Sequence, residues 1–119
     1  MSFKKRSWSF TTAADGTGSL EIGLGARYAR IFELVVDDSS SVSTPAYTIT
    51  DNRGAVLFVS DAQDVSEGPL YNPIGSTAGD VSDDNEAVVA GVIAEGPVTI
   101  SCTGGGNALV NAGSIIVEV

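Results

Sequence analysis

The densest run of side chains with metal-binding chemistry lies at residues 80–86, which read DVSDDNE. The carboxylates of this run offer the oxygen ligands that Ca²⁺ and Mg²⁺ prefer: Asp80, Asp83, Asp84 and Glu86. The run lacks the central glycine and the correctly spaced bidentate glutamate of an EF-hand loop. A cation site and a solvated acidic loop both remain open, and we expect the solvated loop, with no cofactor.

Catalytic side chains are sparse in this sequence. It contains no histidine, which excludes a Ser-His-Asp or Cys-His arrangement. Cys102, the only cysteine, ends an apolar run, so we expect a buried, inert thiol and no disulfide. The glycines at 104–106 lack the lysine of a phosphate loop, and no pair of carboxylates is singled out for glycoside hydrolysis. We therefore expect that the protein is not an enzyme.

The charge of the chain is strongly acidic, with 15 Asp and Glu against 6 Lys and Arg and a formal net charge of -9. Three of the basic residues stand together at the start: Lys4, Lys5 and Arg6. The rest of the chain should repel nucleic acid, because that affinity depends mainly on neutralising phosphates. No stretch approaches the roughly 20 apolar residues of a membrane span, and no signal-peptide core follows the basic run. We expect neither a nucleic-acid nor a membrane partner, and synthesis in a cytoplasm.

The elements that must position these residues are strands. At 119 residues the chain is long enough for one core. Short alternating apolar runs separated by turn residues predict an all-β fold, an antiparallel β-sandwich or jelly roll of eight or nine short strands with no major helix. We expect a basic N-terminal arm over residues 1–6 and a single β-sandwich domain over residues 7–119. The closing run 114–119 should lie inside a sheet.

Three hairpins are predicted from the order of the runs. The clearest joins residues 47–50 to 55–60 through a turn from Asp51 to Gly54. Its second strand is apolar on both faces, which predicts a strand buried on both sides, in the core or at a subunit contact. The other two predicted hairpins join residues 7–12 to 19–24 and 87–94 to 97–102.

Residues 61–86 form a long loop without a convincing periodic run. The loop carries seven acidic residues and no basic one. Structureless loops beyond about 12–15 residues are uncommon in compact domains unless they bind something. Apolar residues beside prolines make good anchors, so we expect docking through Leu70, Tyr71, Pro73 and Ile74, together with the basic arm.

Several segments, in this order and spacing, resemble a family of small tailed-bacteriophage virion proteins. They are SFTTAADGTG, RIFEL, YTITDNRGAVLFV, PLYNPIGSTAGD, TGGGN and GSIIVEV, and they span most of the chain. The resemblance implies a capsid decoration (cement) protein or a head–tail accessory part, with no catalytic motif. The acidic stretch 80–86 departs from the family pattern, where a more apolar, alanine-rich segment is expected.

These observations predict a decoration protein that binds the outer capsid surface and stabilises the shell by bridging its subunits. Its partners would be the major capsid protein and further copies of itself, most simply as a homotrimer, because the chain has more two-sided apolar strand than one sandwich covers. It would be made in the bacterial host cytoplasm and act in the virion. The alternative is a tail or head–tail module that binds a receptor or carbohydrate by stacking on Trp8 or Tyr71, although aromatics spaced by two, such as Trp8 and Phe10, are more often core.

Overall fold

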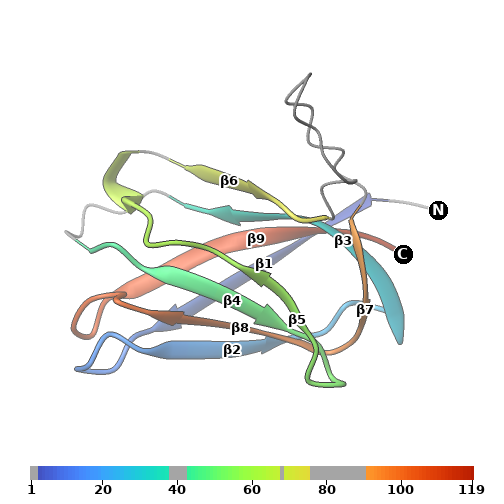
Figure 1. Cartoon of the computed structure of the whole chain (residues 1–119), viewed down its shortest axis with the longest axis horizontal. Helices are drawn as coiled ribbons and strands as arrows, with labels where there is room; N and C mark the ends of the chain where they lie inside the picture. The colour runs from blue at the N-terminus through green and yellow to red at the C-terminus, as the bar shows by residue number, and fades with distance from the viewer. Residues whose placement is uncertain (1–2, 38–42, 68, 76–90) are drawn as a thin grey trace.

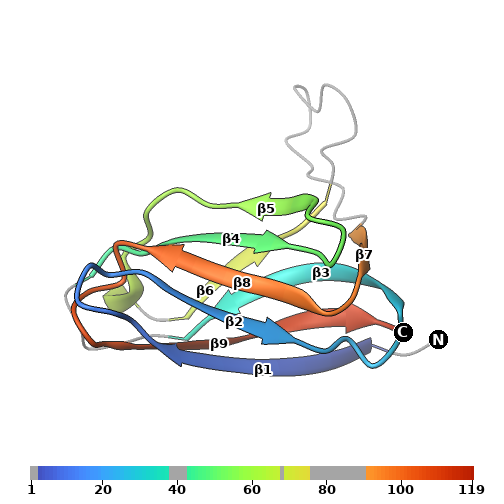
Figure 2. The ribbon, with the colours of Figure 1, turned by 90° about the horizontal axis from the view of Figure 1, so that it is seen from below.

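The protein is a sandwich of two antiparallel sheets, in a computed structural model that describes residues 3–37, 43–67, 69–75 and 91–119 (Figures 1 and 2). One sheet has five strands, in the order β1-β9-β3-β6 with β7 also paired to β3, and the other has four, in the order β2-β8-β4-β5. The predicted all-β sandwich is confirmed. In the described ranges the helical structure is a single 3-10 turn, and no helix is long and apolar enough to cross a membrane.

The nine strands within these ranges are short, as the sequence predicted. Their bounds are β1 Phe3–Thr11, β2 Gly18–Ile22, β3 Tyr28–Val36, β4 Ala46–Thr50, β5 Val56–Val59, β6 Leu70–Pro73, β7 Val92–Glu95, β8 Val98–Thr103 and β9 Val110–Glu118, and the 3-10 turn η1 covers Val65–Glu67. The closing strand β9 lies between β1 and β3, which confirms that it sits inside a sheet.

The core fills the space between the two sheets with the inward-facing side chains of alternate residues. Its centre is aromatic. The Trp8 ring stacks on Phe10 at a centroid distance of 5.5 Å and meets the edge of Tyr47 at 5.6 Å. Trp8 is 3% exposed, so it is a core residue and the alternative of a stacking platform for sugar at this position is wrong. Burying each such side chain contributes about 1.5–3 kcal/mol.

One polar contact joins the two sheets, and one glycine allows close packing within the five-stranded sheet. The Tyr47 hydroxyl donates a hydrogen bond of 2.7 Å to Asn111 Oδ1 in the buried interior. Burial raises the pKa of Tyr47, which keeps this donor protonated. At Gly113 a Cβ atom would collide with the Val35 carbonyl oxygen and the Trp8 ring, so only glycine fits between β3 and the core.

Two of the three predicted hairpins are wrong. β1 and β2 belong to different sheets, since β1 pairs with β9 and β2 with β8. In the same way β7 pairs with β3 while β8 pairs with β2 and β4. In both cases the apolar residues of consecutive strands meet across the core rather than side by side, which a pattern of alternation cannot distinguish. Residues 87–90 of the third predicted hairpin lie outside the described ranges.

The central hairpin is confirmed, but its second strand is not buried on both sides. β5 is an edge strand that pairs only with β4 among the described strands. A register shift opposite Thr50 turns both Val56 and Val59 outward, where they are 61% and 65% exposed. Leu57 and Phe58 pack against the core instead. The bulge therefore gives β5 one apolar face and one exposed face.

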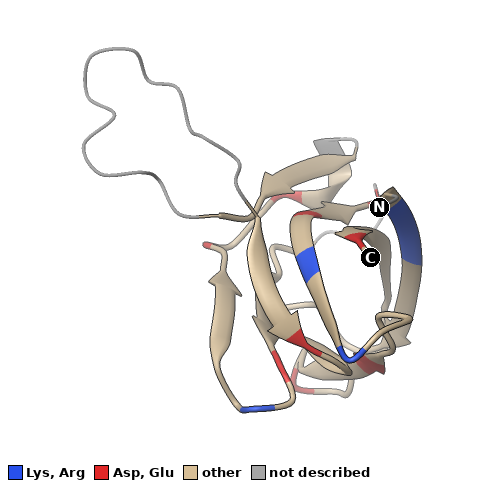
Figure 3. Cartoon of the chain, turned by 90° about the vertical axis from the view of Figure 1, so that its right-hand side faces the viewer, with Lys and Arg blue, Asp and Glu red and all other residues tan. Residues whose placement is uncertain are grey.

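The basic segment is not an arm in the described residues. Lys4, Lys5 and Arg6 belong to β1 and pair with Val117, Ile116 and Ile115 of β9. The reason is that β9 extends to Glu118 and offers backbone hydrogen-bonding groups to the start of the chain. In Figure 3 the blue segment beside the N-terminus is this basic run. The boundary that the sequence predicted at residue 7 thus falls within a strand.

Candidate docking surface

The outer surface of the five-stranded sheet carries most of the large exposed apolar side chains of the described residues, the exceptions being Val56 and Val59 of β5. We call this surface the apolar face. The residues of its strands alternate, so those opposite the core point to solvent. By register and exposure its apolar members are Phe3, Phe32, Val35, Tyr71, Pro73, Ile93 and Ile116. Phe3 and Tyr71 are 67% and 64% exposed, which identifies the apolar face as a surface without a partner in the single chain.

A bulge in β3 helps to build this face. The register with β9 shifts between Ile31 and Glu33, so Phe32 is the extra residue. Its carbonyl oxygen accepts a hydrogen bond of 2.8 Å from the Ile74 N–H. Its ring lies 5.3 Å from the ring of Phe3, centroid to centroid. Two aromatic side chains from strands at different positions in the sheet thus meet on the apolar face.

One end of the apolar face is hollowed into a pocket of about 250 Å³. Residues from β3, β7 and β9 and the C-terminal residue line it: Tyr28, Ala29, Arg30, Ile93, Glu118 and Val119. The Arg27 guanidinium stacks 5.2 Å above the Tyr28 ring, on the wall of this pocket. The pocket therefore combines apolar walls with one acidic and one basic side chain.

The apolar face brings together three of the residues predicted to dock. Tyr71 and Pro73 of β6 lie on it, and Lys5 of β1 lies in the same cross-strand row as Pro73. The row runs Lys5, Ile116, Glu33, Pro73. The sequence placed these residues in an arm and a loop, whereas the structure places them on two strands of one sheet.

The other predicted docking residues do not lie on this face. Ile74 is 1% exposed and belongs to the core, so its proposed role as an anchor is wrong. Leu70 packs against the core because it faces the same side of β6 as Asn72. Lys4 is exposed on the opposite side of β1. The alternation of a strand accounts for all three, since successive residues of a strand cannot share a face.

Arg6 also faces inward, at the end of the sandwich. A Cβ atom at Gly25 would collide with its guanidinium, so this glycine, with φ of +83°, makes room for the side chain. The Nε atom of Arg6 is buried and has no hydrogen-bond partner among the described residues. Arg6 is therefore a packing residue of the sandwich end, and its charge is not presented to a docking partner on the apolar face.

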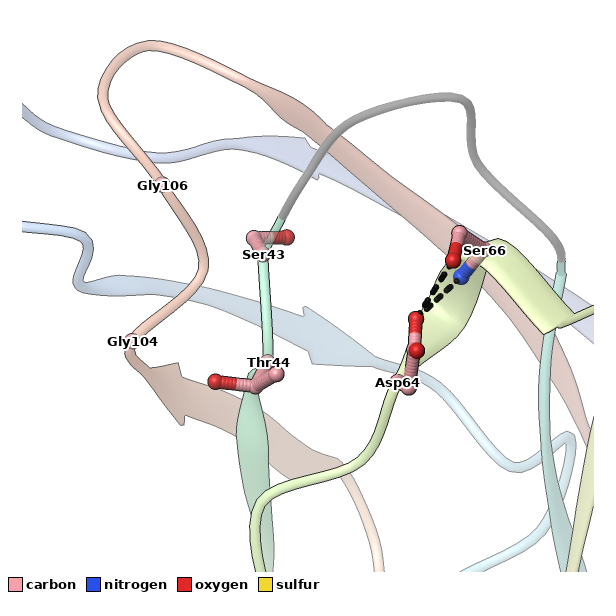
Figure 4. Close-up of a pocket in the computed structure, with 6 residues that line it drawn as sticks. All are labelled: Ser43, Thr44, Asp64, Ser66, Gly104 and Gly106. Atoms are coloured by element: carbon pink, nitrogen blue, oxygen red, sulfur yellow. Dashed lines mark hydrogen bonds between the residues drawn. The ribbon is translucent and has the colours of Figure 1, made fainter.

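A second, polar pocket of about 290 Å³ lies at one end of the sandwich (Figure 4). It is lined by Ser43, Thr44, Asp64, Ser66, Gly104 and Gly106. Asp64 Oδ1 accepts hydrogen bonds from the Ser66 hydroxyl at 2.6 Å and the Ser66 N–H at 3.0 Å. These bonds lower the pKa of Asp64. The carboxylate therefore closes a local turn, and its lowered pKa makes it a weak base toward the Ser66 hydroxyl.

The strongest ionic contact is a structural one, on the four-stranded side. Asp51 accepts hydrogen bonds from the backbone N–H groups of Arg53, Ala55 and Glu95 and pairs with the Arg53 guanidinium at 2.6 Å. Burial alone would raise the pKa of Asp51, but these bonds outweigh it and lower the pKa to about 2. They tie the β4–β5 turn to the end of β7.

The chemistry available elsewhere is limited. Cys102 is buried, and burial raises the pKa of its thiol, which makes it a poor nucleophile. Within the described parts of the chain no group of acidic or thiol side chains is arranged to hold a metal ion. The predicted cation candidates Asp80, Asp83, Asp84 and Glu86 lie outside the described residues.

Sequence reasoning missed five members of the apolar face: Phe3, Phe32, Val35, Ile93 and Ile116. The signal for three of them was present, since the runs 31–36 and 115–117 carry apolar residues on both faces. That pattern predicts a partner on each side of the sheet. It does not say which strands adjoin, and so it could not assemble the face.

Comparison with known proteins gives little. No family model and no curated protein sequence matches the chain. A chain in a structure titled "Structure of infectious bursal disease virus Gx strain" aligns with 96% of this chain and 31% of its own length, at a TM-score of 0.34 and 13% identity. A TM-score of this size is too low to indicate a common fold or function.

Proposed function

We propose that the protein is a non-enzymatic structural component of a virus particle, a capsid decoration (cement) protein of a tailed bacteriophage. It docks through the apolar face onto the outer surface of the shell. One observation carries this proposal: Phe3, Tyr71 and Ile93, all exposed, share the outer surface of a single sheet. Large apolar side chains gathered in this way mark a protein–protein interface.

Tyr71 is the anchor that the geometry favours most. It stands on β6 opposite Val35, where the residue is 64% exposed and its backbone is hydrogen-bonded in the sheet. A tyrosine held on a strand loses little conformational freedom when it is buried by a partner. Aromatic residues of this kind make up many interface hot spots. The apolar face is thus rigid before it meets the shell.

The sequence likeness to small phage virion proteins supports the shell as the partner. In such an assembly the major capsid protein is repeated many times, and each joint between its subunits is a binding site. Weak contacts at each site add up when copies bridge neighbouring subunits, which stabilises the shell. Synthesis in the bacterial host cytoplasm would place the protein where shells assemble.

Charge should affect the rate of association with the shell more than the affinity of the final complex. The chain carries a net charge of -9, while the apolar face carries both signs, with Lys5 and Arg30 against Glu33 and Glu118. A basic shell surface would therefore attract the acidic molecule from a distance and raise the association rate. The apolar side chains would then limit dissociation.

The second candidate is a tail or head–tail module that binds a receptor or a carbohydrate. The exposure of Tyr71 favours it, since an open ring can stack on a sugar. The copy number in purified virions separates the two candidates: a shell coat needs many copies, and a tail part needs few.

The test is occupancy on particles stripped of the native protein. Tyr71→Ala should bind about 30-fold more weakly than wild type, the equivalent of about 2 kcal/mol for a buried anchor. Thr48→Ala, on the outer surface of the four-stranded sheet, is the matched control and should bind as wild type does. If Tyr71→Ala coats the particles as fully as wild type, the apolar face is not the docking surface.

A further inference from the structure

Four side chains on the apolar face form a row with an apolar residue at each end and two opposite charges at its centre. Phe3 of β1 lies opposite Glu118 of β9, Glu118 opposite Arg30 of β3, and Arg30 opposite Ile93 of β7. The row is therefore apolar, acidic, basic, apolar. Residues directly opposite in a sheet share a face and stand about 4.5–5.5 Å apart.

We propose that two copies of the chain pair through this row, face to face about a twofold axis parallel to the strands. An axis between β9 and β3 lays Phe3 of one copy over Ile93 of the second, and Glu118 over Arg30. The same operation repeats each contact in reverse, as a twofold interface requires. Every apolar group of the row then meets an apolar group, and every charge meets its opposite.

The pocket beside Ile93 provides the space that Phe3 needs. It measures about 250 Å³, and Tyr28, Ile93 and Val119 form its apolar walls. The hollow is open to solvent and not enclosed, so a phenyl ring can pack on its apolar walls without entering a closed cavity. Phe3, which is 67% exposed in the single chain, is the apolar side chain at the far end of the row. The Phe3 side chain and the pocket that would receive it thus lie on the same face of one chain, as a symmetric pair requires.

The charges of the row are compatible with a second copy as the occupant. Two molecules with a net charge of -9 repel each other at long range, but salt screens this repulsion, and the row at the contact is neutral with complementary charges. The next row of the sheet contains Lys5, Ile116 and Glu33. In the pair, Glu33 of one copy stands over Ile116 of the other copy, one strand spacing from Lys5 of that other copy. Opposite charges of the two copies therefore attract each other in both rows, the row of Glu118 and Arg30 and the row of Lys5 and Glu33.

The size of the surface predicts a reversible dimer. The nine residues of β3 extend about 30 Å and four strands span about 15–20 Å, a footprint of about 500 Å². Stable interfaces bury about 800 Å² on each partner, so the pair should dissociate at micromolar concentrations. Taken with the proposed function, the dimer covers the apolar face in solution and releases it when the chain docks on a particle.

Charge reversal tests the pairing in the free protein. We expect wild type to sediment as a dimer of 12.1 kDa chains at tens of micromolar (about the range such a footprint allows) and to dissociate on dilution. Arg30→Glu sets a carboxylate over Glu118 of the second copy, and Glu118→Arg sets a guanidinium over its Arg30. Each variant alone should weaken the dimer at least about tenfold, since like charges meet twice.

Mixing the two variants gives the decisive result. Within each variant copy the neighbouring residues 30 and 118 carry like charges, but across the mixed twofold pair each of them faces an opposite charge. In this pair the carboxylate at position 30 of one copy faces the guanidinium at position 118 of the other, and the native Glu118 faces the native Arg30. The mixture should therefore sediment as a heterodimer although each variant alone is monomeric.

Two controls accompany the mixture. Glu21→Lys, a reversal on the outer surface of β2, should leave the wild-type dimer unchanged. Thermal melts should show that all variants fold.

The proposal is contradicted by a wild-type monomer or trimer, or by a mixture that stays monomeric. Phe3→Ala should also weaken the dimer, and an unchanged dimer would remove Phe3 from the contact. All of these measurements use the free protein without particles, so they test the pairing separately from docking. A monomeric wild type together with loss of particle binding by Tyr71→Ala would overturn the pairing and leave the docking proposal standing.

Discussion

The two sheets bury similar inner faces and differ on their outer faces. The outer face of the four-stranded sheet has two rows of mostly hydroxyl side chains: Ser19, Ser101, Thr48 and Val59, and Glu21, Thr99, Thr50 and Val56. The outer face of the five-stranded sheet carries Phe3, Phe32, Val35, Tyr71 and Ile116 in comparable positions. Threonine and serine suit a pleated surface and still bond to water, whereas the apolar side chains gain only from a partner.

This difference lies in the residues between the core positions. In β4 and β8 each core residue is followed by a threonine or serine, as in Ile49-Thr50 and Ile100-Ser101. In β3 and β9 the intervening positions include Val35 and Ile116. In the proposed function, docking is carried by these alternate residues, which contribute nothing to the shared core. Exchanging the two kinds of face should change binding and leave folding in place.

The largest expected effect comes from disturbing the sheet beneath the apolar face. Gly113→Ala should destabilise the protein by about 3 kcal/mol, because its Cβ meets both the Val35 carbonyl and the Trp8 ring and forces β3 and β9 apart. Chemical denaturation measures the loss. Gly23→Ala is the control, since a Cβ there meets nothing within 4 Å. Equal stability of the two variants would mean that the fit at Gly113 is not tight.

A smaller loss is expected on the four-stranded side, at Asp51. Asp51→Asn should cost about 2 kcal/mol, because hydrogen bonds to a charged group contribute about 1.5–3 kcal/mol. The pKa of Asp51 is lowered to about 2, so its stabilisation is full above pH ~4 and is lost as the pH falls toward 2. Wild type should lose stability across this window, and Asp51→Asn should lose less. Parallel pH profiles for the two proteins would contradict the assignment.

The smallest effect on stability is expected from replacing apolar side chains on the two outer faces. Ile116→Thr on the apolar face and Val59→Thr on the hydroxyl face should each change the unfolding free energy by less than about 1 kcal/mol. They should differ in association, since Ile116 lies in the surface that we propose pairs and docks. Sedimentation at matched concentration compares them. If Val59→Thr weakens association as much as Ile116→Thr, the two faces are not distinct in function.

The sequence predicted the fold class because strand periodicity is a local property. The run 114–119 gave β9 and the turn from Asp51 to Gly54 gave the central hairpin. Which strands pair is not local, and so the crossings after β1 and β7 were missed. A pattern of alternation is the same whether two strands meet edge to edge or across a core.

The candidate site was predictable only in part, for the same reason. Tyr71 and Pro73 were identified from their composition and their loop-like context, but Ile74 was included although it faces the core. Phe3 carried no sequence signal, because its role depends on β9 reaching the start of the chain. Residues that make a face by register can be found only once the register is known.

The central claim is that a partner covers the apolar face and leaves the hydroxyl face open, and cysteine labelling on the particle tests it most directly. Cys102 is buried, so a single introduced thiol can be followed. Ser7 of β1 is exposed on the apolar face and Ser19 of β2 is exposed on the hydroxyl face, which makes Ser7→Cys and Ser19→Cys a matched pair. On particles, Ser7→Cys should be protected from alkylation and Ser19→Cys should react as fast as in the unfolded chain. Equal reactivity of the two thiols on the particle, or protection of Ser19→Cys alone, would contradict the account.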